Sequence, residues 1–315
     1  MRIGIVSPQA GPPPTGASAY VAGLVAGWRA HGHEVVARPA MDAEDALTII
    51  DGAALHAAAL PDAARAVALV HHPFGGRDDA ARERETAALR TVRVIATDPA
   101  TAARLGLPAE RIGIVPAGVG DLPRSLGPRS DGPCDVLSVA PLVRRHEQDV
   151  LLRALARLPD LDWTLTLAGA ARDPDYAREL STLAADLGVA ARVRCVAATD
   201  DAGMAALWDH AGCFARATRF ERRPPLLLEA LRRGLPVALA AEGEAAAFVP
   251  PEAGILVAPG DHADLSKALR RIVFDAGLRH LMADAAAAFG ATLPDWPTQA
   301  ALFLETVAAL ELPSG

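Results

Sequence analysis

Two glutamates, Glu221 and Glu229, lie in the segment of this chain whose residues have the most evident chemistry. We expect Glu221 in a loop and Glu229 about one and a half turns into a helix that Pro224 opens and Gly234 closes. Carboxylates can accept hydrogen bonds from sugar hydroxyls, and the free N–H groups at a helix N-terminus attract phosphate. The segment therefore predicts a compact site with the chemistry to hold a nucleotide-sugar.

Length, composition and charge bound the possibilities. A chain of 315 residues, 51% of them hydrophobic, is globular and is expected to form two domains. Its formal net charge of -7 gives no electrostatic support for a nucleic-acid partner. Lys267 is the single lysine among 31 basic residues, so a side chain that holds an anion must be Arg or His.

Cellular location and metal binding can also be judged from the residues. The chain begins directly with an expected strand, with no signal peptide and no apolar run long enough for a transmembrane segment, so we expect a cytoplasmic protein. Cys134, Cys195 and Cys213 have no metal-ligand spacing and are expected to be small buried residues. The Asp173-Pro174-Asp175 sequence imitates a metal-binding pattern, but we interpret Asp175 as a helix N-cap and expect no metal.

Short apolar runs alternate with helical patterns through both halves of the chain, which is typical of parallel sheets covered on both faces. In the first half we expect strands at 3–7, 34–37, 67–71, 92–97 and 112–116 and helices at 17–31, 79–90 and 99–105. In the second half we expect strands at 135–140, 163–168, 193–196, 213–215, 237–240 and 254–257 and helices at 148–158, 175–187, 201–210, 261–273 and 298–310. Residues 121–134, rich in Pro and Gly, are expected to link a domain of residues 1–120 to one of residues 135–290, before a last segment at 291–315.

In their order and spacing, motifs along nearly the whole chain resemble the retaining nucleotide-sugar glycosyltransferases of family four. The stretch Ser7–Tyr20, with Gly16, is similar to the family's glycine-bearing first loop, and Glu221 and Glu229 fall on its two glutamates. The other similar segments are His31–Val35, Val115–Val119, Val139–Leu155, Gly234–Val237, Gly254–Asp261 and the helix at Trp296. The resemblance implies the α/β fold called GT-B, in which two Rossmann-like doubly wound domains face each other across a cleft and a C-terminal helix crosses back to the first domain.

The resemblance also implies roles for individual residues. Glu221 would contact the hydroxyls of the donor sugar, and Glu229 those of the ribose. Backbone N–H groups near Gly16 and at 223–226, which includes Leu226, would meet the phosphates. His71 or His72, after a strand of the first domain, would lie beside the donor sugar, and the sequence does not choose between them. In such enzymes the leaving diphosphate is thought to help deprotonate the acceptor, so neither a metal nor a dedicated carboxylate base is required.

The cations that this family uses to neutralise the departing diphosphate are replaced in this chain. The family's Gly-Arg-Leu reads Ala140-Pro141-Leu142 here, and its Lys-Gly reads His146-Glu147. The family's Glu-Gly-Phe-Gly reads Glu221-Arg222-Arg223-Pro224, so two glycines are lost and two arginines are gained. Guanidinium groups bind phosphate in a bidentate manner. We therefore expect the diphosphate to be served by five residues: Arg144, Arg145, His146, Arg222 and Arg223.

The sequence thus predicts transfer of a sugar from a nucleotide-diphosphate donor to an unknown acceptor. The first domain would select the acceptor, and the second would hold the donor. The replaced cations leave an alternative open, namely a catalytically silent GT-B domain that binds a nucleotide or a partner subunit. An epimerase that acts on the nucleotide-sugar itself is a third possibility. The nucleotide base, the sugar and the oligomeric state carry no readable signal.

Overall fold

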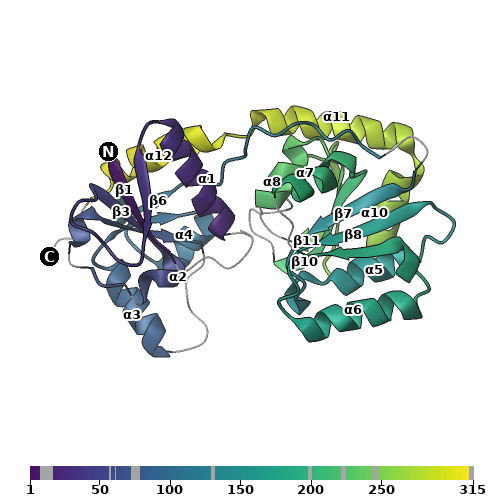
Figure 1. The fold of residues 1–315 in the computed structure, drawn as a ribbon, viewed down its shortest axis with the longest axis horizontal. Coiled ribbons are helices and arrows are strands. Elements are labelled where there is room, and N and C mark those ends of the chain that lie inside the picture. Colours follow the sequence, from purple (N-terminus) through teal and green to yellow (C-terminus); the bar gives the residue numbers. More distant parts are fainter. Residues whose placement is uncertain are drawn as a thin grey trace. The chain divides into compact units, whose positions relative to one another are not determined.

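The computed structural model describes residues 1–7, 17–56, 58–60, 62–71, 79–128, 132–197, 201–220, 225–242, 246 and 248–311. The chain forms two compact units, of which unit 1 contains residues 1–120 and 294–315 and unit 2 contains residues 121–293. In its described part, each unit holds a six-stranded parallel sheet with helices packed on it (Figure 1). The predicted α/β class with two Rossmann-like units is confirmed.

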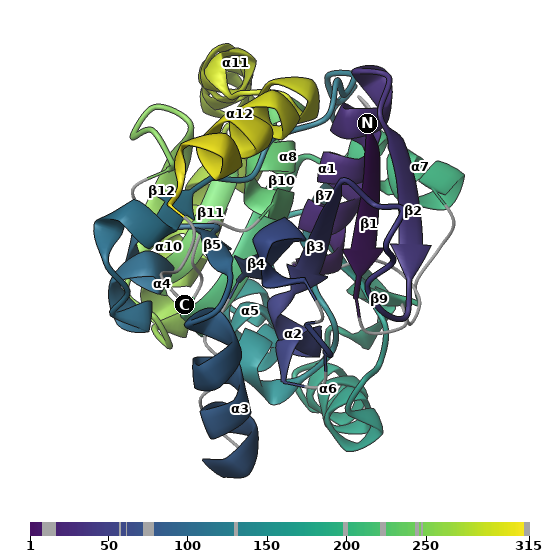
Figure 2. The ribbon, with the colours of Figure 1, turned by 90° about the vertical axis from the view of Figure 1, so that its left-hand side faces the viewer.

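Unit 1 is built on a sheet with the strand order β2-β1-β3-β4-β5-β6 (Figure 2). Its strands are β1 (Arg2–Val6), β2 (Glu34–Arg38), β3 (Leu47–Asp51), β4 (Ala66–Val70), β5 (Arg93–Ala96) and β6 (Ile112–Ile114). Its α-helices are α1 (Ala17–Ala30), α2 (Gly52–Leu55), α3 (Asp79–Leu89), α4 (Pro99–Leu105) and α12 (Trp296–Ala309). Two 3-10 turns, η1 (Ala63–Arg65) and η2 (Ala109–Arg111), precede β4 and β6.

Helix α12 closes unit 1 by packing along α1 (Figure 1). The indole nitrogen Nε1 of Trp28 on α1 donates a hydrogen bond to the carbonyl oxygen of Ala300 at 3.0 Å. The Trp28 ring meets the ring of Phe303 edge to face, with centroids 5.2 Å apart, and Tyr20 meets Trp296 in the same way at 5.4 Å. The end of the chain therefore contributes to the core of unit 1.

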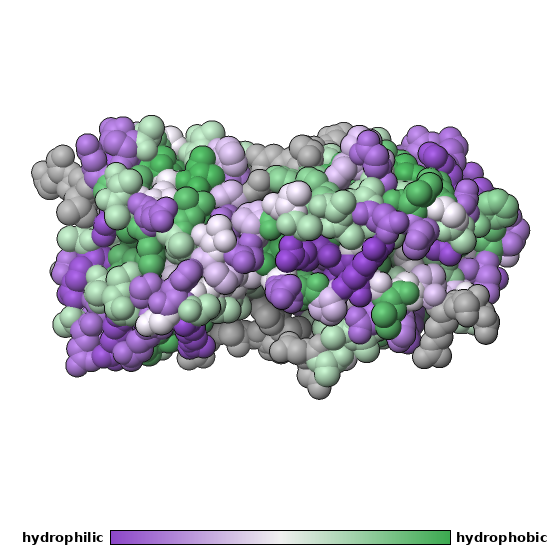
Figure 3. Space-filling model, turned by 90° about the horizontal axis from the view of Figure 1, so that it is seen from above, coloured by the Kyte–Doolittle hydropathy of each residue, from purple (hydrophilic) through white to green (hydrophobic). Residues whose placement is uncertain are grey.

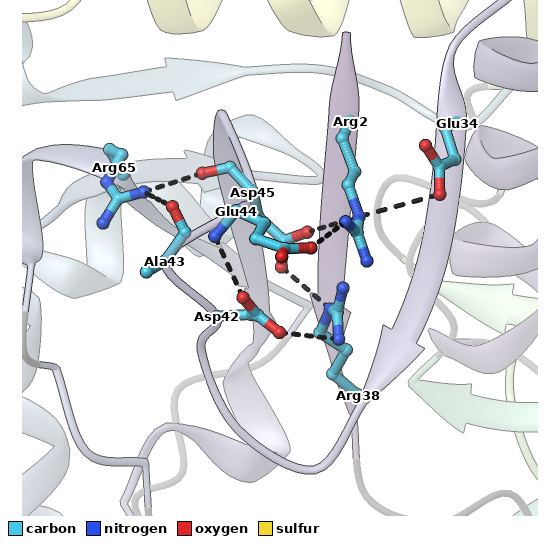
Figure 4. Close-up of polar contacts among 8 residues, drawn as sticks. All are labelled: Arg2, Glu34, Arg38, Asp42, Ala43, Glu44, Asp45 and Arg65. Atoms are coloured by element: carbon cyan, nitrogen blue, oxygen red, sulfur yellow. Dashed lines mark hydrogen bonds and ion pairs between the residues drawn. The ribbon is translucent and has the colours of Figure 1, made fainter.

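A buried carboxylate, Asp45, lies against the β1–β2 edge of the unit 1 sheet. Figure 4 shows the side chains of Arg2 from β1 and Arg38 from β2 converging on it. Nε of Arg38 is 3.0 Å from Oδ2 of Asp45, and Nε of Arg2 is 3.5 Å from Oδ1. A Cβ added at Gly4 would lie 2.1 Å from Oδ2, so the absence of a side chain on β1 makes room for the carboxylate. The ion pairs hold the segment between β2 and β3 against the sheet.

Unit 2 has the strand order β12-β11-β10-β7-β8-β9. Its strands are β7 (Cys134–Val139), β8 (Trp163–Ala168), β9 (Val193–Val196), β10 (Cys213–Phe220), β11 (Val237–Glu242) and β12 (Gly254–Val257). Its α-helices include α5 (Gln148–Ala156), α6 (Pro174–Asp186), α7 (Asp201–His210), α8 (Pro225–Arg232), α10 (His262–Phe274) and α11 (Ala276–Thr292), with 3-10 turns η3 (Arg144–His146) and η4 (Ala190–Arg192).

The side chains of unit 2 alternate along each strand to fill two cores, one on either face of the sheet. On one face α5, α6 and α10 bury Leu151, Leu180 and Leu269, whereas on the other α7 and α8 bury Trp208 and Leu231. Figure 3 shows hydrophilic and hydrophobic residues interspersed on the face of the units that it draws. No helix in the described part of the chain is both long enough and apolar enough to span a membrane.

Four elements differ from the sequence-based expectation. Strand β3 and helix α2 lie in a stretch where no element was predicted, and α11 (Ala276–Thr292) was not predicted either. Strand β10 continues to Phe220, five residues beyond its predicted end. The segment expected to be a linker packs on unit 2, where the N–H of Ser125 donates to the carbonyl oxygen of Arg233 at 2.8 Å.

Candidate functional site

Strand order places the site of unit 2 between two neighbouring strands, β7 and β10. From β7 the chain continues to β8 and β9 on one side, and from β10 to β11 and β12 on the other. In a doubly wound sheet, ligands bind beyond the carboxyl ends of the two strands at which the order reverses. The residues that follow β7, including the turn η3 (Arg144–His146), and those that follow β10, including α8, therefore surround the expected ligand position.

His146 forms one side of this arrangement and faces β10. Its Nδ1 atom lies 3.3 Å from Nη2 of Arg216, which is a buried residue of β10. Beside it, the hydroxyl of Thr218 donates to the backbone carbonyl oxygen of Arg145 at 3.4 Å. Burial, then the charges of Arg216 and Arg145, lowers the pKa of His146 to about 4. The imidazole is therefore neutral at physiological pH.

Arg144, two residues earlier in the same turn, is engaged elsewhere. Its guanidinium forms a bidentate pair with Glu179 of α6, at 2.7 and 2.5 Å, and lies 5.4 Å over the ring of Tyr176. Arg144, Tyr176 and Glu179 also line a hollow of about 230 Å³ that includes Asp149 of α5. This hollow belongs to the α5 and α6 side of unit 2. A phosphate role for Arg144 would require that the pair with Glu179 be broken.

The turn η3 ends at Glu147 in an unusual backbone conformation. Its φ of 46° and ψ of 40° lie in the left-handed region, where glycine is favoured and most other residues are strained. This position is where the resemblance places glycine. The local backbone is therefore kept although its side chain has changed.

Glu229 lies on the other side of the switch point, in the second turn of α8, one turn after Leu226. Its Oε1 atom accepts a hydrogen bond from Nε of Arg233 at 3.1 Å. Arg233 is itself buried, and its guanidinium lies 5.6 Å over the ring of Trp208. Burial raises the pKa of Glu229, and the charge and hydrogen bond of Arg233 oppose that rise. Glu229 is thus a largely buried carboxylate held by one arginine.

In unit 1, His71 directly follows β4 and is half-buried. Its ring meets the ring of Tyr20 edge to face, with centroids 5.2 Å apart. The Tyr20 hydroxyl donates to the carbonyl oxygen of Val115 at 2.7 Å, and the Thr101 hydroxyl donates to the carbonyl oxygen of His71 at 3.2 Å. His71 is therefore held in place at the carboxyl end of a central strand.

Sequence reasoning missed several buried charged residues, among them Arg216 and Asp51. Asp51 ends β3, next to β1 at the point where the order of the unit 1 strands reverses. Its carboxylate caps α2 by accepting from the N–H of Ala53 at 2.9 Å. Burial raises the pKa of Asp51, against hydrogen bonds from Ala53 and the Ser7 side chain. The signal for both was a charged residue at the end of, or within, an apolar run.

Five of the predicted site residues, Gly16, His72, Glu221, Arg222 and Arg223, lie outside the described residues. Their roles stay predictions, as do those of the six described ones. Among the residues that the structure describes, no group of three or more His, Cys, Asp or Glu side chains is placed to hold a metal ion.

Two smaller expectations were wrong. The N-cap of α6 is Asp173, whose Oδ1 accepts from the N–H of Tyr176 at 3.0 Å, whereas Asp175 lies inside the first turn and pairs with Arg178. The helix begins at Pro174, so the residue before the proline caps it. Cys195 is exposed, unlike the buried Cys134 and Cys213, because it lies on the edge strand β9.

Comparison with known proteins identifies relatives of this chain. The sequence profile of the family "Glycosyl transferases group 1" matches residues 126–289, which is just over half of the chain. The lipopolysaccharide core biosynthesis glycosyltransferase LpsE of Rhizobium meliloti (strain 1021) is 32% identical over 160 residues. That match covers 49% of this chain and only 44% of LpsE.

Solved structures share the fold at low sequence identity. The structure of Anabaena HepE in complex with UDP and glucose superposes with a TM-score of 0.78 at 19% identity, over 98% of this chain and 99% of that one. Sucrose-phosphate synthase from Thermosynechococcus elongatus gives a TM-score of 0.78 at 20% identity, with the same coverage of 98% and 99%. These similarities establish the GT-B fold.

Proposed function

Because this chain belongs to the group 1 glycosyl transferases, we propose that it transfers a sugar from a nucleoside-diphosphate donor to an acceptor, with retention of configuration and without a metal ion. The observation that carries the proposal is the position of the polar groups of unit 2. His146 lies in η3, the turn that follows β7, and contacts Arg216 within β10, while Glu229 lies in the helix that follows β10. All three fall within the part of the chain that matches the family.

The donor is held by unit 2 in this proposal. Glu229 accepts hydrogen bonds from the ribose hydroxyls, and Glu221 from the hydroxyls of the sugar. The diphosphate is met by Arg145 and His146, by Arg222 and Arg223, and by the N–H groups around Leu226 and Gly16. His71 or His72 of unit 1 lies beside the sugar. UDP-glucose is the first donor to test, because the Anabaena HepE structure holds UDP and glucose.

A binding experiment tests the ribose role of Glu229 directly. Losing a charge-assisted hydrogen bond costs about 1.5–3 kcal/mol, so Glu229→Gln should weaken UDP binding about 10- to 100-fold in calorimetry. The same variant should bind the 2′,3′-dideoxy analogue of UDP as well as the wild type does, because that ligand lacks the hydroxyls. Glu252→Gln, which changes an exposed glutamate of unit 2, is the matched control and should alter neither affinity. An equal loss for both ligands would mean that Glu229 acts on the structure of α8.

Catalysis needs its own measurement. The purified protein should release UDP from UDP-glucose when a saccharide acceptor is supplied, and an acceptor of the lipopolysaccharide-core type is the first choice because LpsE is named for that pathway. The anomeric proton of the product, observed by NMR, should show the configuration of the donor. Activity should persist in excess EDTA. Inversion of configuration or loss of activity in EDTA would refute these two parts of the proposal.

The silent GT-B domain remains the second candidate, and one observation favours it. Arg144 is paired with Glu179, and His146 is neutral at physiological pH. Two of the residues expected to replace the missing cations therefore supply less positive charge for a diphosphate than we expected from the sequence. Binding of nucleoside diphosphates without turnover of any nucleotide-sugar would establish this alternative.

A further inference from the structure

Arg216 is a charged side chain in an apolar environment. It lies in β10, between β7 and β11 in the sheet, and only 5% of its surface is exposed. Its neighbours along the strand, Ala215 and Ala217, are buried and apolar. A guanidinium is costly to remove from water, so its position here calls for a specific set of partners. One of them is His146.

The contact between Arg216 and His146 determines where the proton of the imidazole lies. Arginine is always protonated and has only hydrogen-bond donors. The Nη2 atom of Arg216 lies 3.3 Å from Nδ1 of His146, so Nδ1 must accept and cannot carry a proton. A neutral imidazole with an acceptor at Nδ1 has its proton at Nε2. The arginine therefore fixes the ring in the Nε2–H tautomer.

The electrostatic surroundings of His146 agree with this assignment. Arg216 from β10 and Arg145 from its own turn both disfavour a second positive charge on the ring, in addition to burial, and together they lower the pKa of His146 to about 4. The pair thus combines one buried cation within β10 and one neutral N–H donor in η3, the turn that follows β7. A ligand that meets two donors and one positive charge must offer an anionic acceptor.

We propose that Arg216 is a positioning residue that holds His146 as an Nε2–H donor, and that the pair binds a diphosphate oxygen of the donor nucleotide. This inference rests on the proposed function. Arg216 supplies the charge that a neutral histidine lacks, and His146 supplies a donor in a fixed direction. The two residues together therefore provide the positive charge and the hydrogen-bond donor that a single cationic side chain would provide.

The tautomer can be tested without any ligand. In the ¹⁵N-labelled protein, long-range ¹H–¹⁵N spectra should show His146 with a bare Nδ1 and a protonated Nε2 at neutral pH. Arg216→Met should lose this preference and raise the pKa of His146. Arg194→Met, which removes an arginine from the edge strand β9 of the same sheet, should leave the His146 signals unchanged. A protonated Nδ1 in the wild type would overturn the inference.

Ligand binding tests the second half. Arg216→Met should weaken UDP binding about 10- to 100-fold and leave uridine binding unchanged, because only UDP carries the diphosphate. Arg216→Lys should keep part of the preference of the protein for UDP over uridine. His146→Gln, whose amide can replace Nε2–H, should keep more of this preference than His146→Leu. If Arg216→Met does not fold, the two His146 variants decide the question: equal UDP affinities would overturn the inference.

The two possible failures are distinguishable. If the wild type binds no nucleoside diphosphate, the proposed function is wrong. If the wild type binds UDP, two results for Arg216→Met would show that only the role of Arg216 is wrong. One is an equal loss of UDP and uridine affinity, and the other is no loss of either.

Discussion

Replacing Asp45 by Asn tests the buried ion pairs of unit 1 (Figure 4). The Asp45 side chain has no exposed surface, and its two oxygens face the guanidinium groups of Arg2 and Arg38 at 3.5 and 3.0 Å. Asparagine keeps the shape and removes the charge, which leaves two arginines facing a neutral group. Breaking a buried pair from one side costs about 3–5 kcal/mol. We expect a loss near 3 kcal/mol, because both arginines keep carboxylate partners, among them Asp42 at 2.8 Å from Arg38.

Scanning calorimetry provides the measurement. For a unit of this size, 3 kcal/mol lowers the Tm of the transition by about 6–12 °C. Asp42→Asn is the matched control, since it removes a carboxylate that pairs with the same Arg38 but whose side chain is 35% exposed. An exposed pair is worth about 0.2–1 kcal/mol, so the control should fall by no more than about 4 °C. If the two variants lose the same stability, the buried Asp45 carboxylate contributes no more to stability than the partly exposed Asp42 does.

Three further predictions concern unit 2. Gly234→Ala and Gly188→Ala both place alanine at a φ of +70°, a backbone strain that costs about 1–2 kcal/mol each. Only at Gly234 would the new Cβ meet other atoms, at 3.1 Å. Urea denaturation should therefore show the larger loss of stability for Gly234→Ala. Glu179→Gln should free Arg144 and, if that arginine serves the diphosphate, tighten UDP binding up to about fivefold; unchanged affinity in calorimetry would remove Arg144 from the site. Between pH 6.5 and 4 the unfolded chain binds a proton at His146 before the folded chain does, so protonation favours unfolding. As the pH falls through this window, the free energy of unfolding of the wild type should fall by about 2 kcal/mol more than that of His146→Gln, measured by urea titration. Parallel curves for the two proteins would contradict the lowered pKa of His146.

The parts of the fold that the sequence predicts are those whose local pattern is sufficient. Strands at Trp163–Ala168 and Gly254–Val257 have their predicted bounds, because each is a short apolar run between clear turn residues. Strand β3 was missed although its five residues are all buried, since so short a run resembles any buried segment. Helix α11 was missed because its run of alanines and glycines has no marked apolar stripe.

The candidate site was predictable in its location and less so in its contacts. The position of Glu229 in a helix that ends near Gly234 follows from local signals, and the structure has both. The pair of Arg144 with Glu179 joins residues 35 positions apart, and the contact of Arg216 with His146 joins residues 70 positions apart. Such partners depend on how strands and helices pack, and no local pattern contains that information. Ending β10 too early also hid Arg216 in an expected loop.

The place of α12 has a consequence for synthesis of the chain on the ribosome. The hydrogen bond from Trp28 to Ala300 joins residues 272 positions apart. Helix α12 can therefore pack on the apolar side of α1 only after all of unit 2 has been translated. At typical elongation rates, the 173 residues of unit 2 take roughly 10–35 s. During that interval a nascent, incomplete first half offers chaperones a hydrophobic surface. Any product that stops before α12 keeps this surface exposed and becomes a substrate for proteolysis.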